Sequence, residues 1–497
     1  MKEQRLICRR IADGVSPEIY AGRITVANGT IRLVERGNFV CKQPDELFFD
    51  EEFLLAPAFI DAHGHSDLSL MAMPEAEGKT AQGIGFEISG NCGLSPFPLS
   101  VNNSEHLNEL YRQYQIKLDW SDLSTYLRTL SARQPAMELL PLVGHNTLRA
   151  CVNGYDNTPL TPEKRSVMFA LLDRELRSGA LGLSLGLLYV PGCFADMQEI
   201  TGLMSVVARH NKIVTVHLRS EGDKLQEAVD EMLSAARAAG LQKLHISHMK
   251  TAGLHNHHKL NILLDLLQCN DLRVTGDIYC YDASMTQLSV IMPAPYDRLD
   301  DVTLMQKLQD ESFFRQQLEP VKNSRPAEYW QCVRLLSLPG EYAFLTGKLL
   351  PDAARECNSS IEELFLRILR CGAPMATAAF HTLSHSNMQI LAAHERVVPG
   401  SDESARNRTL QFGSSHPRGF GSHTEYFALR KKQGAGLAQI IKEMTSYPAE
   451  IFNIASIGRI APGCRAGFAL LEPEKYVSRA TWQDAHQTAA GAKLLSF

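Results

Sequence analysis

The stretch PAFIDAHGHSD, residues 57–67, closes an apolar run and decides how the rest of the chain is interpreted. Residues 54–60 are apolar and predict a short buried strand. Because side chains alternate along an extended chain, His63 and His65 point to the same side, together with Asp61. Two imidazoles at the end of a buried strand can bind one divalent metal ion. An isolated His-x-His pair more often lies in a surface loop, so this prediction depends on whether other strands also end in residues that can bind a metal.

The composition bounds the class of protein. The chain has 497 residues, of which 44% are hydrophobic and 21% charged, as in a folded protein with a large core. The net charge of −5 without a basic block argues against nucleic acid or an anionic membrane as a partner. We find neither a signal-peptide core at the N-terminus nor an apolar run of membrane-spanning length. The 11 irregularly spaced cysteines then predict reduced thiols and a cytoplasmic protein.

Apolar strands alternate with helical stretches over most of the chain, which predicts an α/β fold. Eight strands are the number in a closed (β/α)8 TIM-like barrel. The predicted strands cover residues 54–63, 84–91, 138–144, 181–186, 213–218, 243–247, 272–279 and 396–401. Residues 223–239 are a sample helix, with Leu225, Val229, Met232 and Ala236 at helical spacing.

The remaining segments predict additions to the barrel. Residues 1–52 contain short β-like pieces, and the β-like tail 458–497 is expected to return to them as one small β-domain. Residues 53–457 would then form the barrel domain. The stretch between the seventh and eighth strands is far longer than one crossover helix needs, which predicts an inserted subdomain at 288–350.

The ends of the predicted strands carry residues that bind metals. In a (β/α)8 barrel these ends meet at one face, where catalytic groups lie. The residues at the strand ends are His63, His65, Cys92, His217, His248 and Asp402. Nitrogen, sulfur and carboxylate donors together are typical of a zinc site. Six candidate ligands exceed the needs of one tetrahedral ion, which indicates two metal sites that are unequally filled.

Each of these residues also has a structural interpretation. Cys92 alone is most simply a core thiol, His217 and His248 are hydrogen-bonded core imidazoles, and Asp402 is a turn or helix cap. Their joint occurrence at successive strand ends favours the metal site. His245 is expected to point away from that face, because it precedes His248 by three residues.

Several motifs resemble the amidohydrolase superfamily, and within it the D-aminoacylase (N-acyl-D-amino-acid deacylase) family. The resemblance extends over about residues 54–473. Its motifs are PAFIDAHGHSD, SGNCGLS, SGALGLSLGLLYVPG, TVHLRSEGD, HISHMK, DIYCYDAS, GSD and HPRGFG. The SGNCG block distinguishes this family from other members of the superfamily, many of which bridge two metals with a carboxylated lysine on strand four. Here strand four, ALGLSLG, has no lysine, and Cys92 stands where this family uses a cysteine ligand.

The resemblance implies zinc-dependent hydrolysis of the amide bond of N-acyl-D-amino acids, giving a carboxylate and a free D-amino acid, with metal-bound hydroxide as the nucleophile. It implies one tightly bound zinc on Cys92, His217 and His248, and a weaker second site on His63, His65 and Cys92. Asp402 is implied as the general base and acid as well as a metal ligand. The implied groups that bind the substrate carboxylate or line its pocket are Lys250, Tyr189, Tyr281 and Arg418.

Some alternatives stay open. The family's glycine after the catalytic aspartate is Glu403 here, which leaves the acyl and side-chain preference undecided. Lys250 and Arg418 could pair with acidic side chains such as Glu221 or Glu403 instead of a substrate. A cyclic amidase of the hydantoinase or dihydroorotase type keeps the metal and Asp402. A non-catalytic metal-binding barrel keeps the fold without an aligned acid–base. The oligomeric state is open too.

Overall fold

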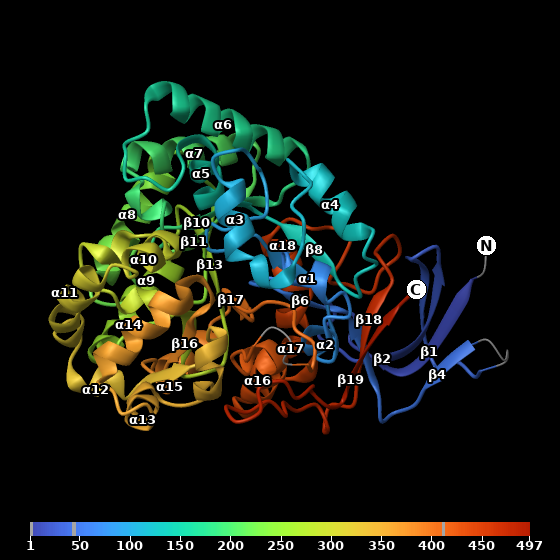
Figure 1. Ribbon diagram of the computed structural model, residues 1–497. Helices are drawn as coiled ribbons and strands as arrows, with labels where there is room; N and C mark the ends of the chain where they lie inside the picture. The colour runs from blue at the N-terminus through green and yellow to red at the C-terminus, as the bar shows by residue number, and fades with distance from the viewer. Residues whose placement is uncertain (1–2, 42–45, 410–412) are drawn as a thin grey trace.

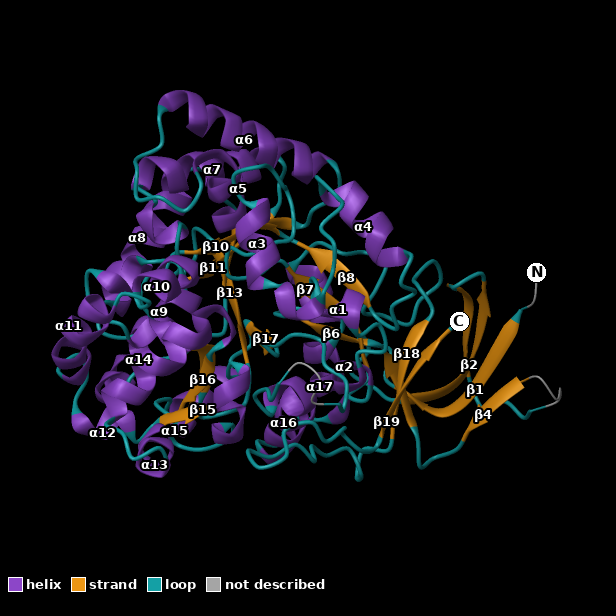
Figure 2. Cartoon of the chain, viewed as in Figure 1, coloured by secondary structure: helices purple, strands orange, loops and turns teal. Residues whose placement is uncertain are grey.

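The structure, a computed structural model, describes residues 3–41, 46–409 and 413–497. A large α/β part makes up most of the chain, and a smaller lobe of strands carries both chain ends (Figure 1). In Figure 2 the helices surround the central strands of the large part, whereas the lobe at the right is drawn as strands and loops. The predicted α/β class is confirmed.

Parallel strands in chain order form the centre of the large part. They fall into a three-stranded group, β6-β7-β8, and a six-stranded group, β9-β10-β11-β12-β13-β17. The first group consists of β6 (Phe59–Asp61), β7 (Ile84–Ser89) and β8 (Glu138–Pro141). The second consists of β9 (Val143–Gly144), β10 (Gly182–Gly186), β11 (Ile213–His217), β12 (Lys243–Ile246), β13 (Arg273–Ile278) and β17 (Val397–Pro399). Six of the eight predicted strands lie at these positions as single elements, with ends that agree within two residues, whereas the predicted strand 138–144 is divided into β8 and β9.

Two backbone contacts link the groups. β8 and β9 are separated only by Leu142, whose N–H donates to Ser89 O at 2.9 Å. At the other edges, Ala62 N donates to Pro399 O at 3.2 Å, beside the ends of β6 and β17. The carboxyl ends of the first and last strands therefore lie next to each other.

The first predicted strand, 54–63, was wrong as a single element. The chain forms β5 (Leu54–Pro57), which pairs with β18 (Gly467–Leu471), and then β6, which pairs with β7. The change occurs at Ala58, whose N–H still donates to Gly467 O, whereas Phe59 N donates to Gly83 O. All residues of both strands are buried, so the apolar pattern could not reveal the change of partner.

Helices follow the parallel strands and cover them. The sample helix is α8 (Leu225–Ala238), and its four predicted apolar residues are buried. Its neighbour α7 (Met197–Arg209) begins at Asp196, whose side chain accepts a hydrogen bond from Glu199 N. Further helices are α1 (Ser69–Ala72), α2 (Glu77–Thr80), α3 (Ser104–Leu110), α4 (Leu123–Ser131), α5 (His145–Asn153), α6 (Pro162–Arg177), α9 (Leu260–Leu267), α15 (His385–Ala392), α16 (Arg418–Lys432), α17 (Leu437–Met444) and α18 (Ser446–Ile451).

The segment between β13 and α15 has its own sheet and core. β14 (Ser284–Gln287), β16 (Thr377–Phe380) and β15 (Val333–Leu335) form an antiparallel sheet. Helices α10 (Asp301–Lys307), α11 (Glu311–Lys322), α12 (Ala327–Trp330), α13 (Leu350–Glu356) and α14 (Ile361–Gly372) pack with it. A separate hydrophobic cluster runs from Leu288 to Phe380. The predicted insertion, 288–350, lies within this segment but ends before α14 and β16, which complete its core.

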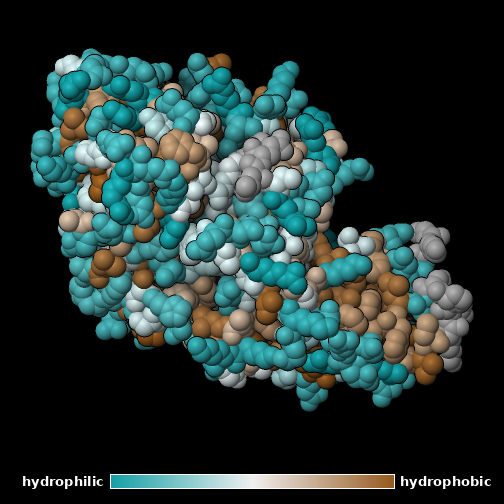
Figure 3. All heavy atoms as spheres, turned by 60° about the horizontal axis from the view of Figure 1, so that its bottom comes forward, coloured by the Kyte–Doolittle hydropathy of each residue, from teal (hydrophilic) through white to brown (hydrophobic). Residues whose placement is uncertain are grey.

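The smaller lobe combines strands from both ends of the chain. Its sheet has the order β19-β18-β5-β1-β2-β3, and β4 pairs with β1. The bounds are β1 (Gln4–Ile11), β2 (Tyr20–Ala27), β3 (Thr30–Arg36), β4 (Glu46–Phe49) and β19 (Ala492–Ser496). On the face in Figure 3, apolar residues gather on this lobe, at the right. Its exposed apolar side chains include Leu33, Leu47 and Phe48.

Among the described residues, each helix is too short or too polar to cross a membrane.

Candidate active site

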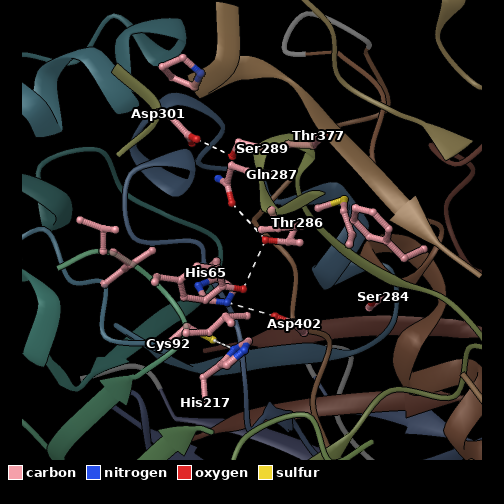
Figure 4. A pocket seen from close by; sticks show the side chains of 18 of the residues that line it. His65, Cys92, His217, Ser284, Thr286, Gln287, Ser289, Asp301, Thr377 and Asp402 are labelled. Carbon is pink, nitrogen blue, oxygen red and sulfur yellow. Dashed lines mark hydrogen bonds and ion pairs between the residues drawn. The ribbon is translucent and has the colours of Figure 1, made fainter. Parts of the chain in front are cut away.

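A cavity of about 810 Å³ opens where the parallel strands end. Five of the predicted ligands line it: His65, Cys92, His217, His248 and Asp402. The sixth, His63, is 0% exposed and contacts Cys92 and Asp402 from below the cavity wall. Figure 4 shows His65, Cys92, His217 and Asp402 together at one end of the cavity, and residues of the inserted segment at the other.

Cys92 lies at the centre of three imidazoles. Its Sγ is 3.4 Å from His63 Nε2, 3.6 Å from His217 Nδ1 and 3.3 Å from His248 Nε2. The SGNCG turn presents the thiol this way, with Cys92 at φ 53° and Gly93 at φ 77°. A Cβ on Gly93 would lie 2.2 Å from Asn146 Oδ1, so only glycine fits beside Cys92.

Asp402 faces the same cluster from the end of β17. Its Oδ1 lies 3.1 Å from His65 Nε2 and 3.5 Å from His63 Nε2. Asp402 N donates to His63 O at 2.7 Å, so the backbones of the first and last strand ends hold each other. The carboxylate is therefore fixed beside the imidazoles by main-chain contacts.

Two carboxylates that the sequence reasoning missed orient these imidazoles from behind. Asp277 Oδ2 lies 3.1 Å from His63 Nδ1, and its Oδ1 accepts from His248 N at 2.9 Å. Glu221 Oε1 lies 2.9 Å from His248 Nδ1, and its Oε2 lies 3.7 Å from His217 Nε2. Carboxylates on the far nitrogen of metal-binding histidines fix the ring orientation. Both residues lie at or just after a strand end, β13 for Asp277 and β11 for Glu221, and this position could have identified them from the sequence.

His245 was predicted to point away from the site, and that prediction was wrong. Its Nε2 lies 3.0 Å from Asp277 Oδ2 and its Nδ1 lies 2.8 Å from Thr275 Oγ1. The side chain is 1% exposed and supports Asp277 from inside the strands. Because β12 ends at Ile246, counting alternation from His248 crossed the end of the strand, where His248 has φ 35°.

Asp61 also does not join the histidines. Its Oδ2 accepts from Lys79 Nζ at 2.5 Å and from Ser401 Oγ at 2.6 Å. Lys79 is fully buried and also lies 3.0 Å from Glu87 Oε2. This buried ion cluster lies beneath the loop that carries Asp402. It could not be predicted from any local sequence pattern.

The electrostatics of the cluster favour ionised donors. Burial raises the pKa of the Cys92 thiol, but the imidazoles of His248 and His63 outweigh burial, so its pKa lies well below the usual value. Burial likewise raises the pKa of Asp402, and Arg418 with the nearby histidines lowers it well below its ordinary range. A thiolate and a carboxylate are thus available at neutral pH.

The donor set fits a zinc-type metal. Ligand atoms of His63, Cys92, His248 and Asp402 all lie within 4.8 Å of one another. Imidazole nitrogens with one thiolate and carboxylates are the donors that zinc prefers in proteins. Six buried or half-buried polar groups without a metal would instead form a costly cluster.

The two predicted carboxylate-binding cations line the cavity, and each already contacts a carboxylate. Lys250 Nζ lies 2.8 Å from Glu221 Oε1 and 2.7 Å from His248 Nδ1. Arg418 Nη1 lies 2.9 Å from Asp402 Oδ2, and Nε lies 4.0 Å from Glu403 Oε2. Neither of these Arg418 nitrogens makes a well-aligned hydrogen bond within the part of the chain described. The guanidinium of Arg418 is therefore held beside the carboxylates of Asp402 and Glu403.

The two predicted tyrosines have different surroundings. Tyr189 lines the cavity, with its ring 4.8 Å from that of His217 and its hydroxyl 3.3 Å from Thr286 Oγ1. Tyr281 lies elsewhere: its ring packs 5.0 Å from His416, and it borders a separate small cavity beside Leu383. The ring that meets Arg418 is that of Tyr279, at 4.5 Å, so the DIYCYD motif offers a different tyrosine from the one predicted.

Known proteins resemble this chain over most of its length. A scan against models of protein families finds no match. N-acyl-D-glutamate deacylase of Alcaligenes xylosoxydans xylosoxydans is 30% identical over 446 residues, covering 88% of this chain and 81% of the relative. The chain belongs to the N-acyl-D-amino-acid deacylase family of amidohydrolases.

Further members of this deacylase family agree. D-aminoacylase of the same organism is 25% identical, over 88% of this chain and 82% of its own length. The crystal structure of N-acyl-D-glutamate deacylase from Bordetella bronchiseptica, in complex with zinc and a phosphonate that mimics the tetrahedral intermediate, superposes with a TM-score of 0.80. That match has 26% sequence identity and covers 99% of this chain and 94% of the other.

Proposed function

We propose that this protein hydrolyses the amide bond of N-acyl-D-amino acids with the help of zinc, releasing a carboxylate and a free D-amino acid. The observation that carries the proposal is the position of Cys92 Sγ, 3.3–3.6 Å from three histidine nitrogens, with Asp402 against the same imidazoles. The similarity to deacylases, one of them solved with zinc, supports it.

We propose that the cluster binds one metal ion tightly and a second more weakly. We assign the tight site to Cys92, His217 and His248, whose rings Glu221 orients. A weaker site would use His63, His65 and Cys92, with Asp402 as a shared ligand. Zinc bound by such donors makes water acidic enough to attack at neutral pH and polarises a carbonyl group.

Asp402 is placed to move the proton. Its carboxylate is ionised and lies against His65, so it can accept the proton of the attacking water at Oδ1. The same oxygen can then deliver that proton to the leaving nitrogen, which must depart as a neutral amine. Arg418 holds the other oxygen, Oδ2, and so keeps the carboxylate oriented.

The substrate carboxylate would be held by cations of the cavity wall. Lys250 and Arg418 line the cavity on the Asp402 side, and Arg418 has buried donors without aligned partners. Tyr189 beside His217 would border the same group. A guanidinium binds a carboxylate through two parallel hydrogen bonds, which also fixes the orientation of the amide.

The fold supports the same proposal. We propose that the two parallel groups close as one (β/α)8 barrel through the Ala62–Pro399 contact, because such barrels carry catalytic groups at the strand ends. We propose that the barrel domain, with the inserted segment, covers 58–457 and that the β-domain covers 1–57 plus 458–497. The boundary expected at residue 53 moves because β5 pairs with β1 and β18 in the sheet of the smaller lobe. The irregular spacing of the 11 cysteines supports the proposed cytoplasmic location.

A substrate screen tests the proposal. Zinc-loaded protein should hydrolyse N-acetyl-D-amino acids, leave their L-enantiomers largely intact and leave hydantoins unopened. Ring opening of hydantoins as the main activity would replace the proposal with a cyclic amidase. A failure with every amide, in protein shown to contain zinc, would favour a non-catalytic barrel.

A further inference from the structure

The cavity is larger than an N-acetylated amino acid requires. Its volume of about 810 Å³ approaches the upper end of the roughly 300–1,000 Å³ of ligand pockets, whereas such a substrate has only about a dozen heavy atoms. The additional space lies between the metal cluster and the inserted segment, and its two sides differ in chemistry.

One side comes from the inserted segment and carries a row of polar side chains beside apolar ones such as Val290 and Leu299. Figure 4 shows Thr286, Gln287, Ser289 and Asp301 leading away from the histidine cluster. Thr286 Oγ1 donates to Gln287 Oε1 at 3.1 Å, and Ser289 Oγ donates to Asp301 Oδ1 at 2.5 Å. This side suits the polar parts of a substrate.

The other side carries more apolar side chains and begins beside Cys92, and His106 and Gln113 of the same stretch also line it. Leu94 follows Cys92 by two residues and lines the cavity. Beyond it lie Leu107 and Leu110 of α3 and Tyr111 with Tyr114, whose rings stack at 6.4 Å. We call Leu94, Leu107, Leu110, Tyr111 and Tyr114 the α3 wall.

The α3 wall continues to an apolar rim. Leu188, Leu254 and Met375 line the same cavity and are 44%, 47% and 40% exposed. Helix α3 contacts the turn of the inserted segment that holds Met375, so the rim bridges the barrel and the insertion. Large exposed apolar side chains at the mouth of a cavity more often belong to a binding surface than to surface without a binding role.

We infer that the α3 wall and its rim bind the hydrocarbon chain of the substrate's acyl group, and that this protein deacylates D-amino acids carrying acyl chains of about six to eight carbons. The inference rests on the proposed deacylase function. Water is the only co-reactant: the C–N bond breaks, hydroxyl joins the acyl carbon, and the proton passes to the amine. We assign the wall to the acyl chain and not to the amino-acid part because it starts beside Cys92, and because Lys250 and Arg418, the proposed partners of the α-carboxylate, are not part of it.

A chain-length series tests the inference. The acetyl, butanoyl, hexanoyl and octanoyl derivatives of one neutral D-amino acid are compared by kcat/KM. Each buried methylene group should raise kcat/KM about fourfold, so the hexanoyl compound should exceed the acetyl compound by up to about 200-fold. A constant or falling kcat/KM with chain length would overturn the inference and leave the deacylase function standing.

Variants locate the effect. Leu110→Ser in the α3 wall should reduce the hexanoyl-to-acetyl ratio about tenfold, and Leu254→Ser at the rim should reduce it less. Leu33→Ser is the matched control, since Leu33 is also 47% exposed but lies on β3 of the other lobe. A ratio that Leu33→Ser changes as much as Leu110→Ser would contradict the location.

A binding measurement keeps the inference separate from catalysis. Calorimetry on the zinc-loaded protein compares the acids acetate, butanoate, hexanoate and octanoate, which need no turnover to bind. Affinity should rise with chain length in the wild-type protein and less in Leu110→Ser. Equal affinities would refute the acyl pocket even if no amide were hydrolysed, whereas rising affinities with no hydrolysis would refute only the proposed reaction.

Discussion

Replacing Lys79 with methionine removes the lysine ammonium group from a cluster in which its carboxylate partners are fully buried. Lys79 Nζ lies 2.5 Å from Asp61 Oδ2, 3.0 Å from Glu87 Oε2, 2.6 Å from Ser401 Oγ and 3.0 Å from the backbone oxygen of Glu403. Lys79, Asp61 and Glu87 are each 0% exposed. The cluster joins the ends of β6 and β7 to the loop that carries Asp402.

The size of the effect follows from this burial. Removing one partner of a buried ion pair typically costs about 3–5 kcal/mol, because a charge stays behind without compensation. Here two carboxylates remain, so we expect the free energy of unfolding to fall by at least about 3 kcal/mol at pH 8. Methionine has a similar length and leaves little empty volume, so most of the loss is electrostatic.

The loss should depend on pH in a defined direction. Burial raises the pKa of Glu87 above its ordinary value even with Lys79 present, whereas Lys79 outweighs burial at Asp61 and lowers that pKa. Without Lys79 both folded-state pKa values rise, so protonation stabilises the variant as the pH falls. The wild-type contribution of Asp61 is present above its unfolded pKa and is lost as the pH falls through its folded value. The difference between the two proteins should therefore shrink toward pH 5.

Urea unfolding of the zinc-loaded protein at several pH values measures this difference. Lys431→Met is the matched control, because Lys431 forms an exposed pair with Glu474 worth about 1 kcal/mol or less. A loss at pH 8 no larger than that of Lys431→Met, or a loss that grows toward pH 5, would refute the reasoning.

Three further predictions concern the active site. Asp402→Asn should retain zinc, measured by elemental analysis, and lower kcat by about 10² or more, because it removes the proposed proton acceptor; near-normal turnover would assign the base elsewhere. Cys92→Ala should weaken zinc binding in a chelator competition, since the thiolate contacts all three imidazoles; an unchanged affinity in folded protein would make Cys92 structural. Arg418→Met should lower the activity on a free N-acyl-D-amino acid by a factor at least about 10 times larger than the factor by which it lowers the activity on the methyl ester, because a charged bidentate contact contributes about 1.5–3 kcal/mol. Equal losses would show that Arg418 serves only Asp402.

The candidate site residues at the strand ends could be predicted from the sequence because they depend on patterns within a few consecutive residues. The alternation of His63 and His65 after an apolar run and the glycines around Cys92 are properties of a few consecutive residues. His217 and His248 likewise stand at the ends of apolar runs that become β11 and β12. Where a pattern crossed the end of a strand, as at His245, or both pairings were buried, as at Ala58, it gave the wrong answer.

Only the tertiary structure decided which charges meet. Lys79 binds Ser401 across 322 positions of sequence, and Asp277 reaches His63 across 214. Lys250 meets Glu221, and Arg418 meets Asp402, as two of several pairings that the sequence allowed. A sequence specifies how each residue biases its own backbone and which side chains avoid water. The distance between two remote side chains is set by the packing of every element between them, so the contacts that orient the ligands exist only in the folded chain.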